Sequence, residues 1–300
     1  MTHFVIFCKS YRNDVLRVKK LLESLPPFNK DKIPFHLSVP RADLDIFKNY
    51  IHSDYLAPSH LGEFYLLTDE KIISSNSQLS LDEYYAMPGS ISQQLIKAEA
   101  WRKIGCDNYL CIDADSYFTK EFSLANFMHP SGHPYSLMHD ANDLLDEALQ
   151  KKKHKVIANF KKDCQIMKTE FEREGPDYDF GPTPVIWSRL VWESLEKLHL
   201  MPRKESIAQA MVRLPQEIKW YGEALLKYKA IPLYPIGPLF ECLHYEWQSK
   251  KTAEVHDYIG IVSQSNWDKH LDPKFARRSF ISRSWGRLRR MLRGLLIKHQ

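Results

Sequence analysis

Four short apolar runs in the first 113 residues alternate with segments of helical spacing, and this alternation constrains the fold more than any other feature. The runs are strand-like and fall at residues 4–8, 34–39, 63–68 and 109–112. Apolar residues recur at helical spacing over 14–25, which Pro26-Pro27 is expected to end, and over 44–51 and 89–104. Strands that alternate with helices predict an open α/β sheet with right-handed crossovers. Such sheets bind ligands at the carboxyl ends of their strands.

Two carboxylates, Asp113 and Asp115, follow the last of these runs. Side chains two residues apart in a strand point to the same face, so the pair should leave the strand end side by side. Adjacent carboxylates are unfavourable unless they share a proton or a cation, and oxygen ligands favour Mg²⁺ or Mn²⁺ with positions open for substrate phosphates. The polar residues after the first run should face the same crevice: Lys9, Ser10, Arg12 and Asn13.

Composition sets the broad class of the protein. At 300 residues and 44% hydrophobic content, the chain can bury the core of one large domain or two small ones. It has no run of about 18 apolar residues, so no membrane span is expected. The first residues lack a basic region and a cleavage site, so no signal peptide is expected. The five scattered cysteines favour reduced thiols in a cytoplasm over a disulfide framework.

The second half of the chain is less regular. Residues 141–174 are highly charged and predict a solvated helix or helical hairpin. Residues 179–186 predict a loop punctuated by Gly and Pro that leads into a helix over 188–198. A glycine turn at Trp220-Tyr-Gly-Glu223 should open another helix, and residues 240–244 are strand-like. No linker is evident, so this half is expected to elaborate the same domain.

These features resemble the GT-A type of glycosyltransferase, in which a D-x-D motif after a central strand holds a divalent metal against a nucleotide-sugar diphosphate. The helix Ser90–Ala98 and the strand Tyr109–Asp115 carry this similarity, which covers about the first 130 residues. More narrowly, the chain is similar to a bacterial group of predicted glycosyltransferases, DUF6492, through Gly181–Pro184, Trp220–Glu223 and Ser265–Trp267. The resemblance implies a Rossmann-like GT-A open mixed sheet flanked by helices.

The resemblance also implies roles for individual residues. Asp115 would bind the metal directly, and Asp113 would contact the ribose or the metal, through a water molecule if not directly. His244, at the end of a strand, would be a third ligand, because neutral imidazole suits Mn²⁺. Lys9 to Asn13 would lie beside the nucleotide base and ribose. Two residues of the preceding helix would reach the ribose or diphosphate: Gln94 and Lys97.

Glycosyl transfer also needs groups that act on the acceptor. The metal would stabilise the charge of the leaving nucleoside diphosphate as a Lewis acid. An inverting enzyme needs a general base for the acceptor hydroxyl, whereas a retaining enzyme does not, and the sequence leaves this stereochemistry open. Glu223 is the first candidate for the base, with Glu217 and Asp179 as alternatives. The segment Asp179–Thr183 and Trp187 are expected on the acceptor side.

The end of the chain differs from the rest in charge. Residues 277–298 hold eight Lys and Arg and no acid, and the apolar residues around Trp285 fall on one arc of a helical wheel. This pattern predicts a basic amphipathic helix over 276–300 that lies on an anionic membrane, with a helix docked on the protein core as the alternative. We expect one GT-A-like catalytic domain over 1–275, with a nucleotide-sugar half (1–130) and an acceptor half (131–275). Nothing matches a nucleic-acid-binding motif.

The sequence therefore predicts a metal-dependent glycosyltransferase. It would move a sugar from a nucleotide donor, UDP-linked, to a hydroxyl of a bacterial surface glycan or its lipid-linked precursor, on the inner face of the cytoplasmic membrane. A nucleotidyltransferase or phosphohydrolase using the same acidic pair is one alternative, although the loop Lys9–Asn13 has no phosphate-cradling glycine. An inactive scaffold recruited to the membrane is the other.

Overall fold

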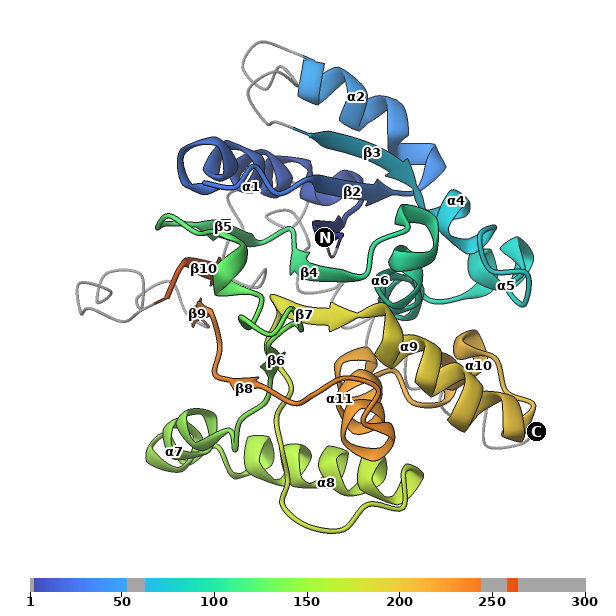
Figure 1. The fold of residues 1–300 in the computed structure, drawn as a ribbon, viewed down its shortest axis with the longest axis vertical. Coiled ribbons are helices and arrows are strands. Elements are labelled where there is room, and N and C mark those ends of the chain that lie inside the picture. Colours follow the sequence, from blue (N-terminus) through green and yellow to red (C-terminus); the bar gives the residue numbers. More distant parts are fainter. Residues whose placement is uncertain (1–2, 53–62, 244–257, 264–300) are drawn as a thin grey trace, which may run out of the picture.

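A five-stranded mixed sheet forms the centre of the computed structural model, which describes residues 3–52, 63–243 and 258–263 (Figure 1). The strand order is β3-β2-β1-β4-β7, in which the first four strands are parallel and β7 is antiparallel to β4. The strands are β1 (Phe4–Lys9), β2 (Phe35–Val39), β3 (Phe64–Thr68), β4 (Asn108–Asp113) and β7 (Val185–Ser188). The order 3-2-1-4 is that of a Rossmann-type half. The predicted open α/β sheet is confirmed.

Helices cover both faces of this sheet because successive side chains of its strands are apolar on both sides. Val5 and Phe7 of β1 belong to one core, and Phe4, Ile6 and Cys8 to the other. The first core is closed by α4 (Asp69–Ile73), α5 (Leu81–Ala86), α6 (Gly89–Ile104), α9 (Arg189–Leu195), α10 (Ile207–Arg213) and α11 (Glu217–Tyr228). The second core is closed by α1 (Val15–Phe28) and α2 (Leu44–His52). A sheet buried on both faces fits the near-continuous apolar runs of its parallel strands.

Helix α1 does not end where the sequence predicted. It runs through Pro26 and Pro27 to Phe28, so the expected stop was wrong by about one turn. Both prolines lie in the last turn, where each removes one i→i−4 hydrogen bond but no further turn of the helix follows. Asn29 ends the helix: its N–H donates to the carbonyl of Leu25, and its side chain makes two 2.9 Å hydrogen bonds to the backbone of Ile33.

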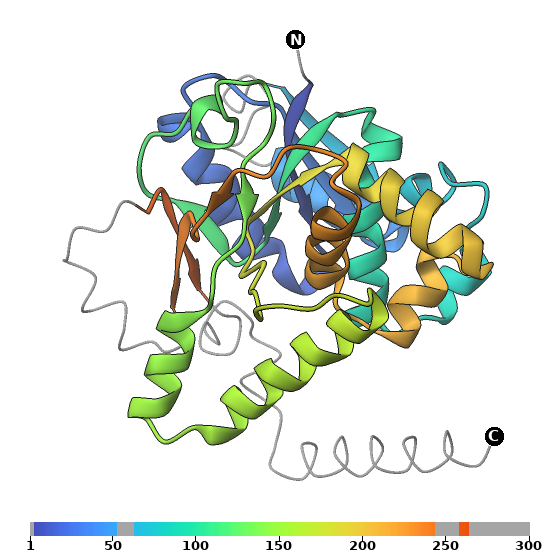
Figure 2. The same cartoon turned by 60° about the horizontal axis from the view of Figure 1, so that its bottom comes forward.

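The charged segment after the sheet forms the predicted helical hairpin. Its helices are α7 (Asn142–Gln150) and α8 (His154–Glu170), drawn in lime at the bottom of Figure 2. Helix α8 lies against α11. Residues 196–200 form a π-helix (η4, Glu196–Leu200). The described residues also form four short 3-10 helices: η1 (Arg12–Asp14), η2 (Arg41–Asp43), η3 (Leu124–Asn126) and η5 (Met201–Arg203).

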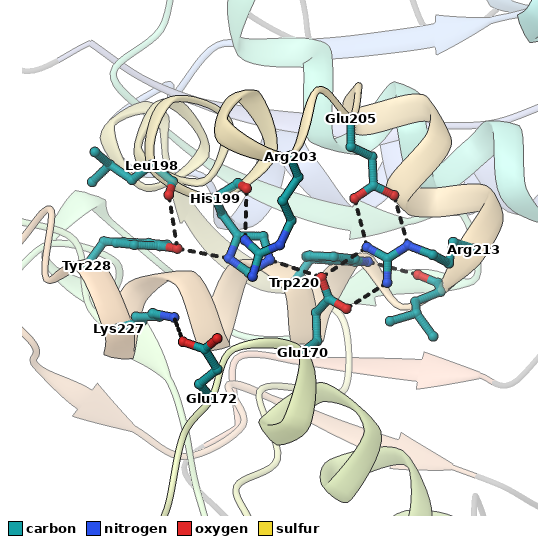
Figure 3. A network of polar contacts seen from close by, with 11 residues as sticks. Glu170, Glu172, Leu198, His199, Arg203, Glu205, Arg213, Trp220, Lys227 and Tyr228 are labelled. Carbon is teal, nitrogen blue, oxygen red and sulfur yellow. Dashed lines mark hydrogen bonds and ion pairs between the residues drawn. The ribbon is translucent and has the colours of Figure 1, made fainter.

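A polar network that extends from the buried His199 to the exposed Arg213 joins α8 to the η4–α10 region (Figure 3). The carboxylate of Glu170 contacts His199 Nε2 at 3.0 Å and is held by two contacts with Arg213, which also pairs with Glu205. The other imidazole nitrogen of His199 lies 2.8 Å from the hydroxyl of Tyr228. Burial lowers the pKa of His199, and the hydrogen bonds from Arg213 lower that of Glu170 to about 2. The network therefore fixes the hairpin on the rest of the fold.

Two sequence interpretations near β7 and α11 were wrong. Residues 185–188, expected to end a loop and begin a helix, form strand β7, and Trp187 is buried against Tyr109 in the core rather than on an acceptor surface. Gly222 is not in a turn but lies inside α11, where a Cβ atom would be 2.2 Å from the ring of Phe180. Glycine is therefore needed there for the close approach of an aromatic ring.

Two small sheets complete the fold. One contains β5 (Ser116–Phe118), β10 (Gly260–Ser263) and β9 (Phe240–Leu243), and the other β6 (Ser136–Leu137) and β8 (Pro235–Ile236). Strand β9 is the predicted strand near residue 240, but His244 lies outside the described residues, as does the expected helix over 276–300. Among the helices that the structure describes, none is both long and apolar enough to cross a bilayer.

Candidate active site

A cavity of about 640 Å³ opens at the carboxyl ends of β1 and β2 and extends to the amino-terminal end of α6. Of the residues expected beside a nucleotide, Lys9, Ser10 and Arg12 line it, whereas Asn13 is not one of the described residues on its wall. Lys9 is the register partner of Asp113 across β1 and β4. Neighbouring strands lie about 4.8 Å apart. Asp113 therefore lies one strand away from a residue of the cavity wall, although neither Asp113 nor Asp115 is itself one of the described residues that line the cavity.

Two buried carboxylates hold the basic residues of the cavity wall in place. The sequence did not lead us to single them out. Asp69 pairs with Lys9 Nζ at 2.8 Å and accepts a hydrogen bond from the hydroxyl of Tyr84 at 2.8 Å. Asp43 accepts hydrogen bonds from Arg12 at its backbone N–H (2.8 Å) and at Nε (2.6 Å). Both acids follow the ends of strands, so the rule that selected Asp113 would also have selected them. Arg12 remains half exposed, whereas the Lys9 ammonium is buried and bound to the protein.

Both carboxylate oxygens of Asp113 are bound by other side chains. Its Oδ1 pairs with Lys97 Nζ at 2.6 Å, and its Oδ2 accepts a hydrogen bond of 2.5 Å from the Thr183 hydroxyl. Burial opposes ionisation, but Lys97 and the two hydrogen bonds outweigh it and lower the pKa of Asp113. About a third of its side chain stays exposed. Asp113 is therefore an ionised, oriented carboxylate that remains partly exposed.

Asp115 has a different environment. Its Oδ1 is buried and has no hydrogen-bond partner within the described part of the chain. Burial, and next the negative charge of Asp113, raise the pKa of Asp115 to about 7. Its backbone is fixed, because its carbonyl accepts a 2.8 Å hydrogen bond from the N–H of Ser263 on β10. The charges of Arg17 and Lys97 oppose the rise in the pKa of Asp115 but do not outweigh it, so the acidic pair combines one fully compensated carboxylate with one that is only partly compensated.

These observations test whether the residues fit a divalent cation. An orphaned, buried carboxylate oxygen is unfavourable on its own and is the kind of ligand that Mg²⁺ or Mn²⁺ prefers. Among the described residues, no group of three His, Cys, Asp or Glu side chains is arranged as a metal site. Strand β9 ends at Leu243, the register partner of Ser263, which contacts Asp115. The pair therefore fits part of a cation site, and the described residues do not complete it.

The candidate bases occupy unlike surroundings. Glu217, at the start of α11, lies 3.5 Å from Lys97 Nζ with 12% of its side chain exposed, so one ammonium contacts both Asp113 and Glu217. Burial raises the pKa of Glu217 although Lys97 opposes it. Glu223 is buried, and both of its oxygens are bound by Arg173 at 2.5 and 2.9 Å. A carboxylate fixed in this way is poorly placed to accept a proton from an acceptor hydroxyl.

Two further predicted residues, Gln94 and Asp179, do not line the cavity but hold neighbouring segments in place. Gln94 accepts a 3.3 Å hydrogen bond from the N–H of Glu217, so it connects α6 to the start of α11 rather than facing the cavity. Asp179 accepts a 3.0 Å hydrogen bond from the N–H of Gly181 and shapes the loop before β7. That loop carries Thr183 to Asp113. Spacing along the chain gave no signal for these contacts between distant segments.

Comparison with known proteins gives a family match and similarity to solved structures. A family model described as "Family of unknown function (DUF6492)" matches residues 5–274. The solved apo structure of mouse xyloside xylosyltransferase 1 is similar over 88% of this chain and 98% of that chain, with a TM-score of 0.45 and 7% identity. At these values the likeness carries no argument about activity. No curated protein matches the chain.

Proposed function

Since the chain belongs to the DUF6492 family, whose function is unknown, we propose an activity from the site itself: a metal-dependent glycosyltransferase that uses a nucleotide sugar, UDP-linked, as donor. The observation that carries this proposal is the buried, unpartnered Oδ1 of Asp115 near the ionised Asp113, which is the register partner of Lys9 on the cavity wall. Open α/β sheets bind ligands at this edge. A cavity of about 640 Å³ has the size of a site for a nucleotide-sized ligand.

The proposed cofactor is Mn²⁺ or Mg²⁺. Asp115 would be the principal ligand and Asp113 a second contact, with His244, the residue after Leu243, as the third. The bound cation would stabilise the negative charge of the leaving nucleoside diphosphate. Lys97 and Thr183 would keep Asp113 ionised and oriented for this contact.

Glu217 replaces Glu223 as the proposed general base. In an inverting reaction the acceptor oxygen forms a bond to the anomeric carbon, the bond from that carbon to the diphosphate oxygen breaks, and the hydroxyl proton passes to the Glu217 carboxylate. A base near the operating pH is most effective, and burial shifts Glu217 in that direction. In a retaining reaction Glu217 would instead position the acceptor.

Calorimetry with UDP, in Mn²⁺ and in EDTA, tests the donor proposal. The wild-type protein should bind UDP more tightly with Mn²⁺, and Asp115→Asn should lose that gain. Release of UDP from a panel of nucleotide sugars then tests transfer, with Glu217→Gln compared against Glu223→Gln. Wild-type transfer by Asp115→Asn would refute the assignment. UDP binding under neither condition would favour the inactive scaffold.

The acceptor and location are proposed from the sequence. A growing bacterial surface glycan or its lipid-linked precursor would bring the enzyme to the inner face of the cytoplasmic membrane. The basic segment 276–300, which lies outside the described residues, would bind the anionic membrane surface. Co-sedimentation with vesicles containing anionic lipid, for the full chain and for a chain ending at residue 275, tests this. Equal binding by both forms would exclude the segment as the anchor.

A further inference from the structure

We propose that the first turn of α6, together with Ser10, forms a binding site for an oxyanion, a phosphate or carboxylate group, separate from the acidic pair. Gly89, Ser90, Ser92 and Ser10 line the same cavity. Lys97, which contacts Asp113, lies eight residues along α6 from Gly89. The rise of a helix makes this about 12 Å along its axis. We therefore place the anion at the helix start apart from the diphosphate that the proposed function assigns to the acidic pair.

The start of α6 is an uncompensated positive helix end. Pro88 occupies the N-cap position and provides no side-chain cap, and the first turn contains no acidic residue. The N–H groups of Ile91 and Ser92 donate to the carbonyl of Pro88, which leaves those of Gly89 and Ser90 as the donors at the very start of the helix. Helix N-termini attract anions because their free N–H groups and macrodipole act together.

Ser10 gives independent evidence for a ligand. Only 2% of this residue is exposed, and its hydroxyl has no hydrogen-bond partner among the residues that the structure describes. A buried hydroxyl without a partner is unfavourable. Because Ser10 lines the cavity, a ligand acceptor atom there would satisfy the hydroxyl.

The charged side chains of the cavity are already matched. Asp43 pairs with Arg12, and Lys9 with Asp69, while Asp14 contacts Arg17. Two carboxylates, those of Asp14 and Asp43, line the wall, but each has a basic partner. The helix end is thus a positive feature that the charged side chains of the described wall do not offset.

Isothermal titration with inorganic phosphate in EDTA tests the site without metal or nucleotide. The wild type should bind phosphate, and Ser90→Asp should weaken binding about tenfold by placing a carboxylate in the first turn. Ser10→Ala should weaken it about fivefold through the lost hydrogen bond. Neither variant should unfold at lower temperature, because an acid suits a helix start and the Ser10 hydroxyl has no partner to lose. Ser77→Asp, at an exposed turn residue outside the cavity wall, is the matched control and should bind as the wild type does.

A second experiment identifies the source of the oxyanion, and this step rests on the proposed function. The affinities of the protein for UDP-glucuronate and UDP-glucose are compared in Mn²⁺. If the wild type binds UDP-glucuronate more tightly and Ser90→Asp abolishes this preference, the anion belongs to the transferred sugar. Equal affinity for the two donors, with phosphate binding retained, would assign it to the acceptor. Absent phosphate binding, or equal binding by wild type and Ser90→Asp, would overturn the site. Loss of UDP binding alone would overturn only the proposed function.

Discussion

Asp115→Asn should stabilise the protein without metal while removing its donor binding. The pKa of Asp115 is raised from its ordinary value of 3.8 to about 7, so the folded state holds this proton more tightly than the unfolded chain. Stability from this group is present at low pH and declines as pH rises from about 4 to 7. The full pKa difference between the folded and unfolded states corresponds to a loss of roughly 4 kcal/mol of stability at alkaline pH. Asparagine keeps a buried polar group, so we expect a gain of about 1–2 kcal/mol.

Thermal unfolding in EDTA at pH 5 and pH 8.5 measures this gain. At about 2 °C per kcal/mol for a chain of this size, the melting temperature of Asp115→Asn should exceed the wild-type value by about 2–4 °C at pH 8.5, and by much less at pH 5. Asp45→Asn is the matched control, because the Asp45 side chain is 91% exposed, and it should not raise the melting temperature at either pH. Added Mn²⁺ should then raise the melting temperature of the wild type alone. A variant less stable than the wild type at pH 8.5 would refute the assignment of a carboxylate that is only partly compensated.

Three further perturbations test the packing around the site. Gly222→Ala should lower the free energy of unfolding by about 1–3 kcal/mol in urea titrations, because its Cβ would overlap the Phe180 ring; a gain of about 1 kcal/mol, as helix propensity alone predicts, would contradict this. Lys97→Met should cost about 3–5 kcal/mol in the same assay by leaving two carboxylates without their cation, and an unchanged unfolding midpoint would show that the pairing contributes little. The pKa of Glu170, lowered to about 2, implies up to about 3 kcal/mol of stability that is present above pH 4.5 and lost as pH falls toward 2; Arg213→Gln should remove most of this acid dependence in unfolding titrations.

The first half of the fold could be predicted because its elements carry local signals. The four apolar runs and the helix Gly89–Ile104 appear where their periodicity indicates, and Gly105 ends that helix with a positive φ of 74°. Strand β7 was missed since its four residues follow a Pro-rich loop and resemble the start of the next helix. The prediction at Gly222 was wrong for a related reason. A glycine that is required because a distant aromatic ring packs on it cannot be told from a turn glycine by sequence alone.

Of the candidate site, only the residues that follow strand ends could be predicted from the sequence. Asp113 and Lys9 are register partners, as the strand-end rule implies. The contacts of Glu217 with Lys97, and of Glu223 with Arg173, join segments 120 and 50 residues apart in the chain. No periodicity encodes which carboxylate receives a guanidinium and which an ammonium, so the choice between the two glutamates required the fold.

The loop between Asp179 and Val185 is anchored at both of its ends. Phe180 packs on the bare backbone of α11 at Gly222, and Thr183 holds the carboxylate of Asp113. A residue inserted or deleted between them would disturb two remote elements at once, so evolution has little freedom to change the length of this loop. New specificities within this family would therefore arise more readily by substitutions within this loop than by lengthening it.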